Sequence, residues 1–265
     1  MHLRITHKTQ YNYDLPIEYA LQKVRLRPVT SDLQNIEDWQ LDIEGGKIET
    51  SYIDHYGNHV DLVSASVGTQ KLIIKAQGVI NTNDAAGVWG RVYGRAPLWH
   101  FSQSTPLTRP GKRIEKLARA VEKAGNVLDG LHDLSAAVIK AVPYETGHTN
   151  TSITAEGAVE IGRGVCQDHA NIFISAARVA KLPARYVSGY LMMNEQVDQD
   201  ATHAWAEVHV DGLGWVGFDV SNGVAPDERY ARIAIGRDAH DAAPISGLRH
   251  GLANESLIVS LQVQQ

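Results

Sequence analysis

The sequence contains a single cysteine, Cys166, among its 265 residues. One cysteine excludes an intrachain disulfide and any metal site that takes two or more thiolates from this chain. No stretch approaches the ~20 consecutive apolar residues that cross a bilayer, and the first residues lack the basic and apolar regions of a secretory signal. We therefore expect a cytoplasmic protein that has no membrane partner.

Positive charge is also scarce. The chain has 25 Lys and Arg against 30 Asp and Glu, which gives a formal net charge of −5. Because no run of basic residues compensates for this balance, we expect no nucleic-acid partner. Hydrophobic residues make up 43% of the chain and charged residues 21%, so it can bury a substantial core. The sequence holds no loop of the D-x-D-x-D-G type, and we expect neither a metal nor a cofactor.

Residues 1–85 predict a β-rich N-terminal module. Segments with alternating apolar and polar residues are separated by glycine-containing turn signals. These segments are Leu3–Gln10, Ala20–Val29, Ile36–Ile43 and Leu72–Ile80. The pattern indicates an antiparallel β-sandwich of small size. Residues 86–110 predict an irregular connection rich in Pro and Gly, whose aromatic side chains pack against a folded part of the chain.

Residues 111–265 predict an α+β core. Helical periodicity runs from Ile114 to Val142 and from Cys166 to Lys181, and Thr154 is expected to cap a short helix between them. Strand-like runs follow at Ala184–Met192, His203–Val210 and Trp215–Val220, and late strands at Ala231–Ile235 and Leu257–Val263 are expected to complete the same antiparallel sheet.

Cys166 stands between a glycine-rich entry, Gly162 to Gly164, and the start of a predicted helix. Unpaired backbone N–H groups and the positive end of the helix dipole meet at such a position, which favours a thiolate. The same N–H groups can receive a negative oxygen of a substrate. An isolated cysteine is more often a small buried hydrophobic residue, so the assignment depends on its partners.

His203 and Asp219 are the partners that the sequence offers. They begin and end two strands joined by Asp211-Gly212-Leu213-Gly214. Side chains alternate along a strand, so a two- or four-residue loop would place His203 and Asp219 on opposite faces. The two glycines favour a three- or five-residue loop or a bulge, which places both on one face. A Cys-His-Asp triad can then attack a carbonyl carbon and form a thioester.

The chain resembles the transglutaminase-like superfamily of papain-like cysteine enzymes, specifically bacterial members with a β-rich N-terminal region. The resemblance rests on GRGVCQDHANIFISAARVAKLPARYVSGYL, THAWAEVHVDGLGWVGFD and VSNG, in that order, and extends weakly to both ends, including IAIGRDAHDAAPISG. It implies Cys166 as nucleophile, His203 as base and Asp219 as the residue that orients the base. His203 follows Cys166 by 37 positions, whereas the papain pattern places the histidine ~130 or more downstream.

The resemblance implies an α+β fold, in which the antiparallel β-sandwich-like module precedes a papain-like/transglutaminase core with helices packed on an antiparallel sheet. Two departures stand out. Relatives often carry Pro-Thr after the aspartate, where this chain has Val220-Ser221. The tryptophan that stabilises the oxyanion in animal transglutaminases has no assignable position, and Gln167, Cys166 and Tyr144 are weaker candidates for that role. Trp205 is expected in the core or in a pocket wall.

Several alternatives stay open. His169 follows Cys166 by three positions, and these two with His203 and Asp219 are on paper a zinc ligand set. We favour acyl transfer on the amide bonds of a peptide, a protein or a small amide. A protease or amidase that uses only water is the first alternative, and a non-catalytic binding module is less favoured. A homo-oligomer is left open.

Overall fold

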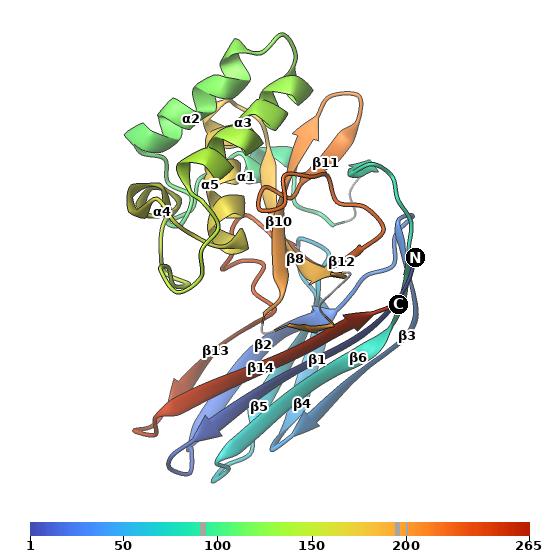
Figure 1. Ribbon diagram of the computed structural model, residues 1–265. Helices are drawn as coiled ribbons and strands as arrows, with labels where there is room; N and C mark the ends of the chain where they lie inside the picture. Colours follow the sequence, from blue (N-terminus) through green and yellow to red (C-terminus); the bar gives the residue numbers. More distant parts are fainter. Residues whose placement is uncertain (91–93, 194–196, 200) are drawn as a thin grey trace.

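The computed structural model describes residues 1–90, 94–193, 197–199 and 201–265. A β-sandwich forms one half of the molecule, and an α+β unit forms the other (Figure 1). This arrangement confirms the predicted fold class, in which a sandwich-like module precedes helices packed on an antiparallel sheet. Among the described residues, no helix is long and apolar enough to cross a membrane.

The sandwich consists of two antiparallel sheets whose inner faces share one apolar core. The first sheet has the order β3 (Gln34–Glu44), β6 (Lys71–Thr82), β1 (His2–Tyr13), β14 (Glu255–Gln264), β9 (Asp198–Gln199). The second has the order β13 (Ile245–His250), β2 (Tyr19–Arg27), β5 (His59–Ala65), β4 (Gly46–Ile53). Leu3 and Ile5 of β1 alternate with outward residues and are fully buried in this core.

The α+β unit is built on a third antiparallel sheet, with the helices shown in Figure 1 gathered at this half of the molecule. The sheet has the order β12 (Tyr230–Gly236), β8 (Ala184–Leu191), β10 (His203–Val210), β11 (Gly214–Phe218), β7 (Val88–Gly90). The helices are α1 (Leu98–Phe101), α2 (Lys112–Lys123), α3 (Val127–Ala141), α4 (Ala155–Ile161) and α5 (Cys166–Val179).

Helix α5 is the central helix of this unit. It packs on β10, where the side chains of Ala204, Ala206 and Val208 face it in one apolar cluster. The short helix α4 begins as predicted, because the Thr154 hydroxyl accepts a hydrogen bond from a backbone N–H of the first turn. Gly162 ends α4 with a left-handed backbone (φ 73°) and turns the chain toward α5.

The last strand is where the sequence prediction is wrong. Leu257–Val263 was expected to complete the sheet of the α+β core, but β14 pairs along its length with β1 of the sandwich. Residues 111–265 are therefore not a self-contained unit, since β13 likewise pairs with β2. Alternating apolar residues identify a strand without identifying its partner, and the buried face of β14 is equally suited to either sheet.

Two aromatic residues of the predicted connection, Trp89 and Phe101, pack against the folded chain as expected, whereas Trp99 is 65% exposed and Tyr93 lies outside the described residues. Trp89 lies in β7 at the edge of the third sheet, and the guanidinium of Arg232 lies 3.7 Å from its ring centre. The guanidinium of Arg185 likewise lies 4.0 Å from the ring centre of Trp215. Both arginines bind the buried carboxylate of Glu207 on β10, at 2.6 Å for Arg185 Nε. These cation–π contacts and ion pairs tie the strands together on the face opposite α5.

The β14–β1 pairing predicts a large stability effect at Leu261, whose side chain is fully buried in the sandwich. We expect Leu261→Ala to lower the free energy of unfolding by about 2–5 kcal/mol, because it leaves a cavity. Ile258 on the same strand is 56% exposed, and Ile258→Ala is the matched control, with an expected effect within about 0.5 kcal/mol. Urea denaturation measures both. Equal effects of the two substitutions would contradict the observed pairing.

Candidate active site

Cys166 is the first residue of α5 and is almost completely buried. Asp168 organises this helix start, because its Oδ2 accepts hydrogen bonds from the backbone N–H of Val165 at 2.8 Å and from the Thr149 hydroxyl at 2.6 Å. Gly164 leaves room for that carboxylate, since an added Cβ would come within 2.8 Å of Asp168 Oδ2. The glycine-rich entry is thus explained by a helix cap of negative charge at the positive helix end.

Gln167 and Tyr144 both lie beside the thiol. The Sγ atom of Cys166 donates a hydrogen bond to Gln167 Oε1 at 3.5 Å. Tyr144 forms an isolated parallel bridge with Gly164, and its side chain is 55% exposed. Burial, and then the negative charges of Cys166 and Asp219, raise the pKa of the Tyr144 phenol. The hydroxyl therefore keeps its proton at neutral pH and can act as a donor.

The hairpin between β10 and β11 has the predicted odd-length loop. Val210 pairs with Gly214, which leaves three loop residues, and Gly212 and Gly214 both have positive φ (84° and 81°). His203 and Asp219 consequently lie on the same face of the sheet. The prediction that loop geometry brings these two side chains together is confirmed.

Asp219 is completely buried and accepts hydrogen bonds from three side chains at one oxygen. Its Oδ2 lies 2.6 Å from His203 Nε2, 2.6 Å from Asn222 Nδ2 and 2.7 Å from the Tyr230 hydroxyl. Burial alone would raise the pKa of this carboxyl. The bond to His203 and its positive charge, with the bonds from Asn222 and Tyr230, outweigh burial and lower the pKa of Asp219.

His203 is bonded on both sides. Nε2 is engaged by Asp219, which leaves Nδ1 for the hydrogen bond with the Cys166 thiol. Burial lowers the pKa of the imidazole, but the hydrogen bonds and negative charges of Asp219 and Cys166 outweigh burial and raise it from 6.5 to about 10. At neutral pH the ring is therefore a cation placed between a carboxylate and the sulfur.

Trp205 and Gly189 support the imidazole from the sheet. The indole of Trp205 stacks on the His203 ring, with ring centres 6.3 Å apart, and meets the Tyr230 ring edge-on at 5.5 Å. Gly189 pairs with His203 across the strands, and a Cβ there would lie 2.5 Å from the indole. Trp205 is fully buried and supports the ring from behind, which places it in the core, one of the two positions expected for it.

His169 does not join the thiol in a metal site. Its Nε2 donates to the carbonyl of Val142 at 2.7 Å, and its Nδ1 accepts from the hydroxyl of Ser221 at 2.8 Å. Burial lowers the pKa of His169, which fits this neutral tautomer. Among the described residues, no group of three His, Cys, Asp or Glu side chains is arranged to hold a metal ion. Ser221, in the segment that departs from the Pro-Thr pattern, thus anchors α5 through His169.

Two residues at the site carry roles that the sequence motifs did not indicate. Tyr230 lies at the start of β12, eleven positions after Asp219 and outside the quoted motifs, and nothing in the neighbouring sequence marks it as a partner of Asp219. Asn222 stands within the VSNG motif, and its spacing of three from Asp219 is typical of a side chain that closes a turn. That spacing is the signal that could have identified it.

A cavity of about 650 Å³ lies beside the helix start. Its lining includes Val165 and Gln167, the two neighbours of Cys166, and Thr202, which precedes His203. Strands of the sandwich provide another part of the lining, including residues of β1, β13 and β14. Both halves of the molecule therefore line this cavity, next to the residues that flank Cys166 and His203.

The charged imidazole predicts a measurable titration. We expect the pKa of His203 to be close to 10, and to be lower in Cys166→Ala while remaining above 6.5, because Asp219 stays in place. Since the folded-state pKa exceeds the ordinary value of 6.5, this group stabilises the fold fully below pH 6.5 and loses its contribution as the pH rises through 10.

NMR titration of ¹⁵N-labelled histidine in both proteins measures the pKa, and Asp219→Asn is the complementary variant. A His203 pKa at or below 6.5 in the unsubstituted protein would contradict the arrangement described. So would a pKa that Cys166→Ala leaves unchanged, because the thiol would then make no contribution to it.

Comparison with known proteins supports the relationship that the motifs indicated. Residues 115–220 match the model of the transglutaminase-like superfamily, and residues 3–81 match that of the bacterial transglutaminase-like N-terminal region. An uncharacterized protein of Mycobacterium leprae is 25% identical over 98% of both chains. An uncharacterized protein of Mycobacterium tuberculosis is 26% identical over 98% of this chain and 91% of its own.

The fold as a whole has also been seen before. A crystal structure of a protein from Cytophaga hutchinsonii, provisionally described as a cysteine protease, superposes with a TM-score of 0.77. It is 21% identical, and the match covers 100% of this chain and 98% of that one. The sandwich and the α+β unit therefore recur together as one architecture. With matches to both the core and the N-terminal models, the chain belongs to the transglutaminase-like superfamily, in the bacterial group that carries this N-terminal region.

Proposed function

We propose that the protein catalyses acyl transfer from an amide through a thioester on Cys166. The observation that carries the proposal is the continuous line of contacts from the thiol through His203 to the buried carboxylate of Asp219. A nucleophile, a base within hydrogen-bond reach and a third group that orients the base make up the arrangement used in covalent acyl transfer. No metal and no cofactor are needed for this chemistry.

The proposed reaction uses Cys166 as a thiolate and His203 as an imidazolium. The Cys166 thiolate attacks the amide carbonyl carbon and forms a C–S bond. The imidazolium of His203 gives its Nδ1 proton to the departing amine as the C–N bond breaks, which leaves a thioester. An acceptor then attacks the thioester carbonyl and gives its proton to the neutral Nδ1, and the thiolate departs. Asp219 holds Nε2–H throughout, so that Nδ1 faces the reacting atoms.

The first turn of α5 is suited to stabilising the oxyanion of the tetrahedral intermediate. Backbone N–H groups of the first helical turn have no partner within the helix and point out of its N-terminus. Those of Cys166 and Gln167 occupy this turn. The Tyr144 hydroxyl adds a third donor near the thiol, since it keeps its proton. We assign the oxyanion contact to the two backbone groups, with Tyr144 beside them.

The acceptor distinguishes a transferase from a hydrolase. An amine acceptor makes the protein a transglutaminase-like acyltransferase, and water makes it a protease or amidase. The whole-chain structural similarity to a protein provisionally described as a cysteine protease favours the second candidate. Both candidates use the same thioester. We propose a peptide, a protein or a small amide as substrate, and the cytoplasmic location stays a prediction.

Substitutions in the triad are predicted to act unequally. We expect Cys166→Ala to abolish ammonia release from glutamine-containing peptides, and Asp219→Asn to slow it by about 10²–10⁴-fold, because the imidazole loses its orientation. Asp211→Asn on the exposed hairpin loop is the matched control and should leave the rate unchanged. Ammonia release under initial-rate conditions measures all three. Full activity of Asp219→Asn would contradict the triad.

Adding a primary amine is predicted to reveal whether the thioester transfers its acyl group to an amine or to water. Peptides are incubated with the protein with and without cadaverine, and both ammonia and the peptide product are quantified. Covalent incorporation of the amine identifies an acyltransferase. Ammonia release without incorporation identifies a hydrolase. If neither product forms, and iodoacetamide alkylates Cys166 at pH 6 no faster than free cysteine, the protein is a binding module and the proposed function is wrong.

A further inference from the structure

The sandwich contributes directly to the cavity beside Cys166. Along β14, the side chains of one face change from fully buried Leu261 to Val259 and then to Leu257, which is 53% exposed. Val259 and Leu257 line the cavity. Val259 pairs with Thr9 of β1 and Leu257 pairs with Tyr11, and these two residues of β1 line the cavity as well. One face of this sheet is therefore core at one end and cavity wall at the other.

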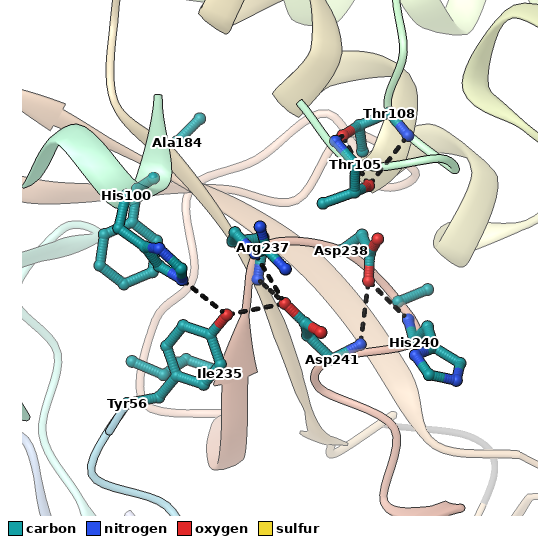
Figure 2. A network of polar contacts seen from close by, with 12 residues as sticks. Tyr56, His100, Thr105, Thr108, Ala184, Ile235, Arg237, Asp238, His240 and Asp241 are labelled. Atoms are coloured by element: carbon teal, nitrogen blue, oxygen red, sulfur yellow. Dashed lines mark hydrogen bonds and ion pairs between the residues drawn. The ribbon is translucent and has the colours of Figure 1, made fainter. Parts of the chain in front are cut away.

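A second wall is the segment that connects β12 to β13, where Ala239, His240 and Ala243 line the cavity. Figure 2 shows how its neighbours are fixed: the Tyr56 hydroxyl donates to Asp241 Oδ2 at 2.7 Å. The Asp238 carboxylate in turn accepts from the backbone N–H of residues 240 and 241. Tyr56 belongs to the turn between β4 and β5, so the sandwich also positions this wall.

The described lining has few titratable acidic or basic side chains, namely Asp168, His7 and His240. It contains no lysine, arginine or glutamate among the residues that the structure describes, and Asp168 is its one acidic residue. Asp168 is itself buried, and its Oδ2 already accepts the two bonds that cap α5. His7 is neutral, because burial lowers its pKa to about 4. Its ring nitrogens bond the hydroxyls of Tyr190 and Thr9.

Uncharged polar groups and apolar side chains share the rest of the surface. Hydroxyls and amides are provided by Thr151, Gln167, Asn171, Ser188, Thr202 and Ser246. A charged ligand group would lose its hydration here without gaining a partner of opposite charge, which is costly. An uncharged polar group can exchange water for these donors and acceptors. The volume of about 650 Å³ lies in the range of pockets that enclose small ligands or short segments, at ~300–1,000 Å³.

We propose that this cavity binds an uncharged, polar peptide segment next to the scissile amide, and that β1 and β14 of the sandwich select it against charged segments. The proposal rests on the proposed function, since it names the substrate class of the same thiol. It also gives the sandwich a role in specificity, because its strands line the cavity that adjoins the helix start at Cys166.

Leu257 offers a charge test with a matched control on the same strand. Leu257 is 53% exposed at the cavity, and Ile258, on the opposite face of the sheet, is 56% exposed. Both positions can therefore accept a long charged side chain. The probes are three chloroacetyl-capped peptides that differ only in flanking serine, glutamate or lysine residues. Intact-mass spectrometry gives the rate at which each peptide alkylates Cys166. Each rate is divided by the rate with iodoacetamide, a reagent too small to need the cavity.

The unsubstituted protein should prefer the serine peptide to both charged peptides by about tenfold. Leu257→Lys should shift the preference toward the glutamate peptide by about tenfold, and Leu257→Glu should shift it toward the lysine peptide. Ile258→Lys should leave all three relative rates unchanged. No preference in the unsubstituted protein, or equal shifts in Leu257→Lys and Ile258→Lys, would overturn the proposal. Slow reaction with iodoacetamide itself would instead overturn the proposed function.

Discussion

The buried hydrogen bond between His203 and Asp219 is the interaction on which the rest of the site depends. A carboxylate removed from water needs several donors, and Asp219 obtains them from the hairpin, from its own turn and from Tyr230 of β12. The same bond fixes the imidazole with Nδ1 toward Cys166. Burial would otherwise discharge His203, so the charge of Asp219 is what keeps the cation beside the sulfur.

The two halves of the molecule are not separate modules along the chain, because the last strands, β13 and β14, belong to the sandwich. Both termini lie in one sheet of the sandwich, where β14 pairs with β1 (Figure 1). The guanidinium of Arg178 on α5 binds the carbonyls of Phe101 and Ala184 and the hydroxyl of Thr108, which fastens the aromatic connection to the α+β unit. The cavity beside the start of α5 is lined by residues from both halves.

The sequence predicted the local features well and the long-range ones poorly. Periodicity located the helix of Cys166 and the hairpin, and the glycines around Leu213 indicated the odd loop that aligns His203 with Asp219. Periodicity did not say which sheet would receive β14, because its alternation suits either. Tyr230 was missed because a tyrosine at a strand start has no local signature. The sequence left Trp205 either in the core or in a pocket wall, because its stacking on His203 depends on the space at Gly189 in another strand.

The most direct test of the central claim is to trap the covalent intermediate. The protein is mixed with an activated peptide ester, whose carbonyl reacts with thiols, and the mixture is quenched in acid within milliseconds to seconds. Mass spectrometry of the intact protein and of its proteolytic peptides then locates the adduct. The account predicts a mass increase equal to the acyl group, located on Cys166, removed by hydroxylamine and absent from Cys166→Ala. Product formation with no acyl adduct, or with the adduct on another residue, would contradict it.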